Sequence, residues 1–270
     1  MKIGCNTIIY GGSDLAIALQ HIAWSGYDGI ELSAIKGVAE HAELGQGRDY
    51  ARRLRRQIAE AGLEVFHIGI HPQLLDAEGQ ERVRKGMELA SDMEVPLVLL
   101  ATMGHPPTAE GFEKACETLG GLAVRARALG LKLAVKPHVG TAVFNTASSL
   151  AMIQKVAEPN LGLDFDISHI YRANESPADS FRALAAHVMT VRVRDAASRD
   201  PQIGPPETQV LGRGVMDIEG ILLAMKESEY RGDISLDIVG AGQYSPDRAM
   251  ALIAETRGYL RCALRAISWE

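Results

Sequence analysis

Charged and histidine side chains stand at the ends of short apolar segments in this chain. The segment LAVKPHVG carries Lys136 and His138 in its second half, and the segment GLDFDISH carries Asp166 and His169 in its second half. A buried ammonium group is costly unless a carboxylate pairs with it. Carboxylates and histidines can move protons, and a nearby cation can stabilise the negative charge that develops. These residue types therefore predict proton-transfer chemistry on a small molecule.

The apolar segments alternate with segments of helical periodicity, as in a protein built of β–α units. The expected strands are 2–6, 29–32, 64–70, 97–101, 132–136, 162–166, 189–194 and 234–239. The expected helices are 13–25, 47–61, 78–92, 108–129, 146–157, 176–186, 217–228 and 246–267. Eight such units predict an α/β fold, a (β/α)8 TIM barrel that forms one domain over residues 1–270. No GxGxxG motif follows the first strand, which argues against a dinucleotide-binding sheet.

In such a barrel the functional groups lie at the C-terminal ends of the strands. Four of the eight histidines stand at or just past expected strand ends, which is the strongest functional signal in the sequence. We expect catalytic roles for Lys136, Asp166, His169 and Asp237. We expect substrate-binding roles for His71, His105, His138, Arg192, Arg213 and Glu31. Asp164 is expected to be a deeper partner, and the polar segment 196–214 an active-site loop.

Composition narrows the classes of partner. The chain is 47% hydrophobic with a net charge of −6, so it lacks the basic excess that binds a nucleic-acid backbone. Its three cysteines are widely spaced and suggest buried thiols in a reducing compartment. No apolar segment approaches the ~20 residues that span a bilayer, and the first residues lack a signal-peptide pattern. We therefore expect a cytoplasmic protein without nucleic-acid or membrane partners, and leave a homo-oligomer open.

Several short motifs carry a family resemblance over essentially the whole chain. They are YDGIEL, GLDFDISH, RVRDA, LGRGVMDIEGIL and ISLDIVG, in that order. The chain resembles the xylose-isomerase-like TIM barrels, which include sugar isomerases, sugar-phosphate and keto-sugar epimerases, dehydratases and AP endonucleases. The resemblance implies a carbohydrate substrate. AP endonucleases of this type carry an extra Asp-x-His after strand seven, where this chain has ETQ, so that activity is not expected.

The resemblance also implies a divalent metal held by the last four strands. Its usual ligands are Glu, Asp, His and Glu, and the corresponding residues here are Lys136, Asp166, Arg192 and Asp237. Two of the four are cations, so two alternatives stay open. Either Lys136 and Arg192 replace the metal, or Mn, Zn, Co or Mg binds to Asp166, His169 and Asp237, with help from other histidines.

The resemblance and the residues together predict an isomerase or epimerase that removes a proton next to a carbonyl group. Lys136 or Arg192 would then stabilise the enediolate, and Asp237 or His169 would act as the base. A Schiff base on Lys136 is a variant of this chemistry. A keto-sugar dehydratase or lyase is the first alternative, because it shares the proton-abstraction step. A sugar-binding barrel with a decayed metal site is the second. Arg213 lies where barrels often bind phosphate, so a phosphorylated substrate is also open.

Overall fold

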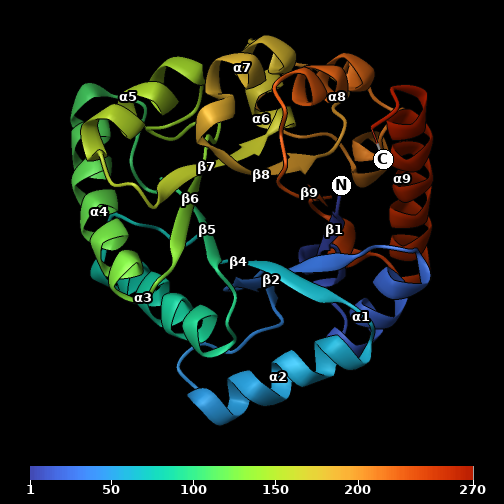
Figure 1. Cartoon of the computed structure of the whole chain (residues 1–270), viewed down its shortest axis with the longest axis horizontal. Coiled ribbons are helices and arrows are strands. Elements are labelled where there is room, and N and C mark those ends of the chain that lie inside the picture. Colours follow the sequence, from blue (N-terminus) through green and yellow to red (C-terminus); the bar gives the residue numbers. More distant parts are fainter. Residues whose placement is uncertain (270) are drawn as a thin grey trace.

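The computed structural model describes residues 1–269, and its strands form a closed parallel barrel (Figure 1). The barrel strands are β1 (Ile3–Asn6), β2 (Gly29–Ile35), β4 (Glu64–Gly69), β5 (Leu97–Ala101), β6 (Lys132–Lys136), β7 (Leu161–Asp166), β8 (Val188–Val193) and β9 (Ile234–Leu236). Neighbours pair in chain order, and β1 pairs in parallel with both β2 and β9, which closes the barrel. The predicted (β/α)8 fold is confirmed, and each expected strand overlaps one of these eight.

Helices surround the barrel in a ring (Figure 1). They are α1 (Leu15–Trp24), α2 (Arg48–Glu60), α3 (Ala77–Asp92), α4 (Ala109–Ala128), α5 (Thr146–Val156), α7 (Pro177–Leu184), α8 (Ile218–Glu227) and α9 (Pro246–Ala266). Polar side chains cap several helix starts, as the sequence suggests: Thr108 accepts a hydrogen bond from the Gly111 amide, and Asn145 forms a capping box with Ser148. No helix within residues 1–269 is long and apolar enough to cross a bilayer.

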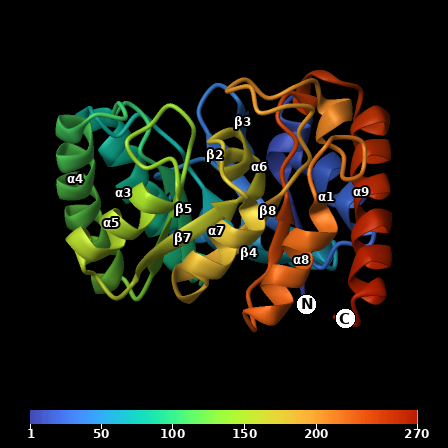
Figure 2. The same ribbon diagram turned by 90° about the horizontal axis from the view of Figure 1, so that it is seen from above.

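Among the short elements that were not predicted, α6 and β3 lie beyond the C-terminal ends of strands. Helix α6 (Ile167–Arg172) begins directly after β7, and its six residues are too few to show a helical period. The Asp166 side chain starts this helix by accepting hydrogen bonds from the Ser168 and His169 amides. Strand β3 (Ala39–Glu40) pairs antiparallel with the end of β2. Figure 2 shows this hairpin at one end of the barrel and the N-terminus at the other.

The interior of the barrel changes in character along its axis. Towards the N-terminal end, Leu97, Leu99 and Ala134 form an apolar cluster with Met189 packed against it. The Phe66 ring also lies in this region, because a Cβ atom on Gly29 would come within 2.4 Å of it. Towards the C-terminal end the interior is filled by charged side chains instead. That change places a polar floor beneath the mouth of the barrel.

Candidate active site

Arg192 on β8 lies at the centre of the charged floor and is fully buried. Its guanidinium bonds to three carboxylates: Nε to Asp164 Oδ2 at 2.6 Å, Nη2 to Glu31 Oε1 at 2.8 Å and Nη1 to Asp237 Oδ2 at 3.2 Å. Burial alone would lower the pKa of Arg192, but these carboxylates hold it above its ordinary value. The residue is therefore a permanent cation inside the barrel, tied to β2, β7 and the end of β9.

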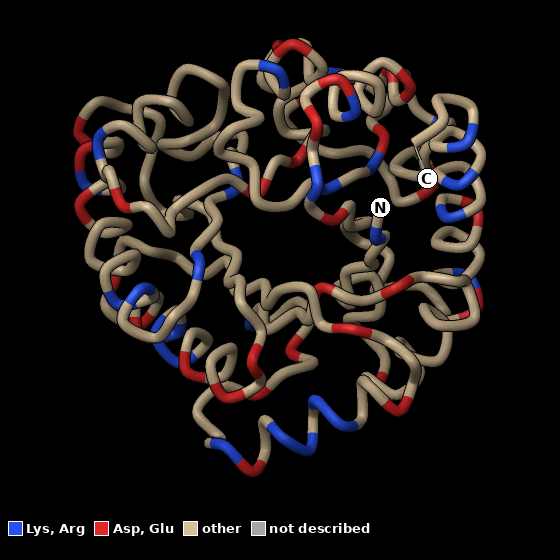
Figure 3. The backbone as a smooth tube through the Cα atoms, viewed as in Figure 1, with Lys and Arg blue, Asp and Glu red and all other residues tan. Residues whose placement is uncertain are grey.

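Arg194 directly follows the last residue of β8 and lies on the same face as Arg192, two residues before it. Its Nη2 lies 2.8 Å from Asp166 Oδ2, its Nη1 lies 3.3 Å from Asp237 Oδ2, and its Nε donates to Ser168. Burial alone would raise the pKa of Asp166, but Arg194, His169 and Lys136 hold it well below its usual range. Figure 3 shows both acidic and basic positions on the inner ring of strands.

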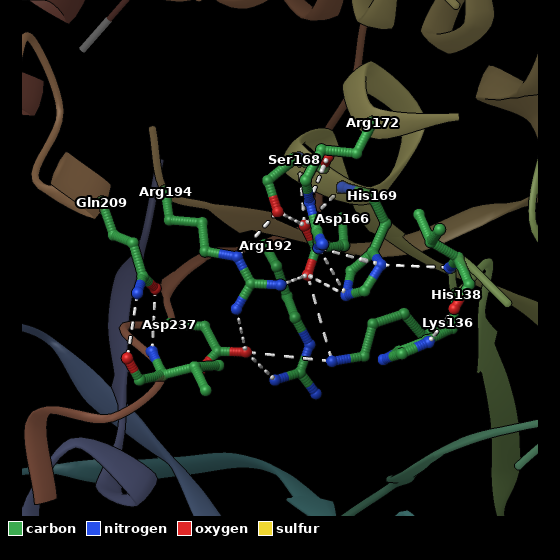
Figure 4. A network of polar contacts seen from close by, with 12 residues as sticks. Lys136, His138, Asp166, Ser168, His169, Arg172, Arg192, Arg194, Gln209 and Asp237 are labelled. Atoms are coloured by element: carbon green, nitrogen blue, oxygen red, sulfur yellow. Dashed lines mark hydrogen bonds and ion pairs between the residues drawn. The ribbon is translucent and has the colours of Figure 1, made fainter. Parts of the chain in front are cut away.

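Lys136 ends strand β6, and its ammonium group lies between two carboxylates (Figure 4). Its Nζ lies 3.9 Å from Asp166 Oδ2 and 3.8 Å from Asp237 Oδ2. These distances exceed those of a direct hydrogen bond, so the lysine is attracted to both carboxylates without being bonded to either. Burial, and after it the Arg192 guanidinium, lowers the pKa of Lys136. The ammonium group therefore has donor capacity left for a ligand.

Asp237 follows strand β9 and collects the positive charge of the site. Its Oδ2 faces Arg192, Arg194 and Lys136, whereas its buried Oδ1 has no hydrogen-bond partner among the described residues. Burial alone would raise the pKa of Asp237, but these three cations lower it. A buried carboxylate oxygen without a partner is unusual, and here it belongs to a residue that lines a pocket.

Three histidines stand around this floor as neutral rings. His71 Nε2 accepts from Arg192 Nη2 at 3.2 Å, and burial with the Lys136 and Arg192 charges lowers the pKa of His71 well below its ordinary value. Its backbone has a φ of 39°, which is rare for a residue other than glycine and typical of functional sites. Burial and the Lys136 charge lower the pKa of His138 to about 4. Burial likewise lowers the pKa of His169.

The tautomers of His138 and His169 follow from their hydrogen bonds. His138 Nδ1 lies 2.9 Å from the Val139 carbonyl oxygen, so it carries the proton and leaves Nε2 as an acceptor. His169 Nδ1 faces two donors, the Val139 amide at 3.2 Å and Arg172 Nη2 at 3.1 Å, which favours the proton on Nε2, where Asp166 Oδ2 lies 3.9 Å and Arg172 Nη2 3.3 Å away. The two rings lie against each other with centroids 4.0 Å apart. His138 can therefore accept a hydroxyl proton, and His169 can donate one.

A second polar layer lies beneath Arg192, towards the N-terminal end of the barrel. Fully buried His67 places Nδ1 3.5 Å from Glu31 Oε2 and Nε2 3.1 Å from Asp233 Oδ2. Burial alone would lower the pKa of His67, but Asp233 and Glu31 raise it. Burial raises the pKa of Glu31 against the opposing charges of Arg192 and His67. This layer supports the Glu31 carboxylate that holds Arg192, and neither His67 nor Asp233 lines the pocket above.

The floor opens into a pocket of about 520 Å³ at the C-terminal end of the barrel. Six residues predicted for the site line this pocket: His71, Lys136, His138, His169, Arg192 and Asp237. Two more, Asp166 and Glu31, lie directly beneath it and contact the arginines. The pocket thus brings together residues from strands that are far apart in the sequence, as a TIM barrel mouth does.

The last two predicted residues, His105 and Arg213, neither line the pocket nor contact its arginines. His105 is buried, and its two ring nitrogens have no hydrogen-bond partner among the described residues. Arg213 lies on the surface, where its Nε donates to Glu255 Oε1 of α9 at 2.7 Å. Arg194 and Asn6 line the pocket but were not predicted to act there. Strand alternation in the sequence places Arg194 on the same face as Arg192, although no role was expected for Arg194.

The side chains at the expected metal position do not fit a divalent cation. Lys136 and Arg192 provide positive charge where the resemblance implies ligands, and Asp237 Oδ2 is already shared among three cations. Within residues 1–269, no group of three or more His, Cys, Asp or Glu side chains has the arrangement of a metal site. A dication here would face Lys136, Arg192 and Arg194 at close range. The donor set therefore favours binding of a negative or polar ligand atom.

Comparison with known proteins agrees with this architecture. The family model described as "Xylose isomerase-like TIM barrel" matches residues 19–261. The chain belongs to the xylose isomerase-like TIM barrel family. Solved structures with this fold include D-psicose 3-epimerase, with a TM-score of 0.80 and 16% identity over 98% of this chain and 99% of that one. They also include the IolI protein with a bound zinc atom, with a TM-score of 0.80 and 17% identity over 98% and 99% of the two chains.

Curated relatives in this family include both epimerases and a dehydratase. A 3-dehydroshikimate dehydratase of Pseudomonas aeruginosa is 26% identical over 87% of this chain, which spans only 38% of that protein. An L-ribulose-5-phosphate 3-epimerase of Salmonella paratyphi C is 22% identical over 88% of this chain and 86% of the epimerase. The family of this chain therefore contains enzymes of both kinds that were considered from the sequence.

Proposed function

We propose that this protein is an isomerase or epimerase that removes a proton next to the carbonyl group of a sugar or a related hydroxylated compound. The observation that carries the proposal is the position of the Lys136 ammonium group, 3.8 Å from Asp237 Oδ2 and 3.9 Å from Asp166 Oδ2, on the floor of the pocket. A fixed cation with free donors can bind a carbonyl oxygen. It then stabilises the negative charge that this oxygen gains in the enediolate.

The proposed reaction uses Asp237 as the base, because this carboxylate lines the pocket and its Oδ1 has no hydrogen-bond partner among the described residues. The C–H bond next to the carbonyl breaks, its proton moves to Asp237 Oδ1, and its electron pair forms the enediolate. Return of a proton to the opposite face gives an epimer, and return to the neighbouring carbon gives an isomer. The neighbouring cations make Asp237 a weak base, so stabilisation of the enediolate by Lys136 must supply much of the driving force.

In this proposal Lys136 takes the place of the divalent metal that the family resemblance implies. The side chains at the expected metal position support this substitution, because Lys136 and Arg192 stand where metal ligands are expected. His138 and His169 would bind substrate hydroxyls, as acceptor and donor respectively. The histidine tautomers support these roles, since His138 Nδ1 and His169 Nδ1 are both engaged with Val139.

A dehydratase is the second candidate, favoured by the similarity to a 3-dehydroshikimate dehydratase. The dehydratase would form the same enediolate. The hydroxyl group on the next carbon would then leave as hydroxide, which takes a proton to become water. His169 is the candidate donor of that proton, because its hydrogen bond from the Val139 amide leaves the proton on Nε2. The two candidates differ only after the shared first step.

Solvent exchange tests the shared step. The protein, treated with a chelator, is incubated in D2O with a panel of ketoses and cyclic keto-polyols, and carbon-bound deuterium is followed by NMR. We expect exchange into at least one compound, and loss of that exchange in Asp237→Asn with the fold retained by circular dichroism. Absence of exchange with every compound would favour the sugar-binding alternative. Exchange that requires one equivalent of Mn or Zn would overturn the metal-free mechanism.

A further inference from the structure

The mouth of the pocket differs chemically from its floor. The floor carries buried charges, whereas the lining nearer the mouth combines the apolar side chains Ile8, Ile35, Val38, Met103 and Val239 with polar residues such as Lys36, Gln73 and Glu78. Val38 is 55% exposed and Val239 is 38% exposed, so both present apolar surface to solvent at the entrance. Apolar surface held open beside a binding site usually meets a ligand.

The order of residues along the chain explains the change from floor to mouth. Asp237 is only 2% exposed on the floor, and Val239 lies two residues further in the direction in which β9 runs. Val38 lies in the turn between β2 and β3, beyond the C-terminal end of β2. Both valines line the same pocket as Asp237 and are more exposed than it. Any part of a ligand that extends out of the polar floor towards them meets apolar surface.

The charges around the pocket argue against a phosphorylated ligand. Among the described residues that line it, every arginine and Lys36 is bonded to a carboxylate, and Lys136 alone lies 3.8–3.9 Å from its carboxylates. At the rim, Lys36 Nζ lies 2.7 Å from Glu78 and Arg82 Nη2 lies 3.0 Å from Glu40. Arg213, expected from the sequence to bind phosphate, pairs with Glu255 away from the pocket. A phosphate group would have to compete with these carboxylates for its cations.

We propose that the substrate is an uncharged hydroxylated carbonyl compound that carries an apolar substituent. Its carbonyl end would contact Lys136 and Asp237, and the substituent would pack against Val38 and Val239. The inference rests on the proposed function for the carbonyl end, whereas the apolar end rests on the pocket walls alone. The pocket volume of about 520 Å³ falls within the range of about 300–1,000 Å³ that accommodates drug-sized ligands.

A series of alkyl glucosides tests the apolar end without any reaction. Methyl, butyl and hexyl β-D-glucopyranosides share one sugar and differ only in apolar length, and calorimetry gives each Kd. We expect Kd to fall about 3- to 4-fold per added methylene until the walls are covered. Glucose 6-phosphate should bind no more tightly than glucose. A Kd independent of chain length, tighter binding of the phosphate, or no binding at any length would overturn the proposal.

Variants at the mouth assign the effect to the walls. Val38→Asp and Val239→Asp should each flatten the dependence of Kd on chain length, and Val239→Ile should preserve it. Val124→Asp is the matched control, because Val124 is 47% exposed on the outer helix α4 and does not line the pocket. Persistence of the full dependence in both aspartate variants would overturn the proposal. So would dissociation of an oligomer by Val38→Asp, seen by light scattering, because a second copy would then cover the mouth.

These measurements separate the inference from the proposed function. The glucosides cannot form an enediolate, so their binding does not depend on proton abstraction. A chain-length effect without exchange into any carbonyl compound would leave an apolar sugar-binding pocket and remove the enzyme. Exchange into simple ketoses without a chain-length effect would retain the enzyme and remove the apolar substituent.

Discussion

Two arginines predicted for one site lie in opposite surroundings. Arg192 is buried in the barrel and bonded to Asp164, Glu31 and Asp237. Arg213 lies on the surface with 44% of its side chain exposed, and it pairs with Glu255, which is 43% exposed. Guanidinium and carboxylate groups thus form a desolvated network around Arg192 and a solvated pair at Arg213.

The difference shows how burial changes the meaning of an ion pair. An exposed pair exchanges its partners for water at little cost, so its contribution to stability is small. A buried pair cannot lose one member without leaving an uncompensated charge. The interior network around Arg192 therefore holds Asp237 and, through it, Lys136 in fixed positions. This fixed arrangement of charge is what the proposed chemistry needs.

Arg192→Leu removes the cation at the centre of the buried network. Three buried carboxylates would lose their shared cation, and we expect the free energy of unfolding to fall by about 3–5 kcal/mol. Urea denaturation followed by circular dichroism measures this change. Arg192→Lys is the matched control and should lose less, because it keeps the charge. A loss below about 1 kcal/mol in the leucine variant would contradict the idea that Arg192 holds the network together.

Lys136→Met removes the cation that lies between Asp166 and Asp237 without a close bond to either. Loss of a preorganised stabiliser of negative charge should slow deuterium exchange by about 10²- to 10³-fold. We expect the variant to fold, because Arg192 and Arg194 still neutralise Asp237. The exchange rate of a responsive ketose is compared with that of Lys136→Arg, which keeps a positive charge. An unchanged rate in the methionine variant would remove Lys136 from the mechanism.

Acid pH tests whether the pocket histidines are neutral, as burial beside the interior cations requires. The pKa of His138 is about 4 in the folded protein against an ordinary value of 6.5. Between these values the unfolded chain binds a proton that the folded protein does not, so stability falls as the pH decreases from about 6.5 to about 4. His138→Gln should reduce this slope by up to about 1.4 kcal/mol per pH unit. Urea titrations at several pH values measure it, and an unchanged slope would mean that His138 is charged when folded.

Arg213→Ala removes the exposed pair with Glu255 and should have the smallest effect on stability and exchange. We expect it to change the free energy of unfolding by less than about 1 kcal/mol and to leave deuterium exchange unchanged. Addition of about 0.5 M salt should reduce even this difference, because exposed pairs are screened. A large loss of exchange would return Arg213 to the functional residues that the sequence suggested.

Much of the fold follows from local patterns that the sequence shows directly. Strands β5 and β6 have the predicted bounds, Leu97–Ala101 and Lys132–Lys136, because a buried parallel strand is a continuous apolar segment between turns. Helix α6 was missed because it is shorter than two turns and starts directly on the capping residue Asp166. Strand β3 was missed because its two residues carry no periodicity at all.

The candidate site could likewise be predicted only in part. That Lys136, His138, Arg192 and Asp237 would share one end of the barrel follows from their places at strand ends, since parallel strands end on the same side. The pairing of Arg213 with Glu255 could not be predicted. Arg213 lies in a loop, and the path of a loop depends on what it packs against.

The sequence by itself determined the barrel, the direction of its strands and the set of charged residues at its mouth, because these depend on apolar periodicity and strand alternation. Only the tertiary structure decided which charges are buried together and which of their atoms stay free. The Lys136 ammonium group lies between Asp166 and Asp237, and Asp237 Oδ1 has no partner among the described residues. Such relations join strands that are far apart in the chain, and their strength depends on distance and desolvation, which no local pattern records.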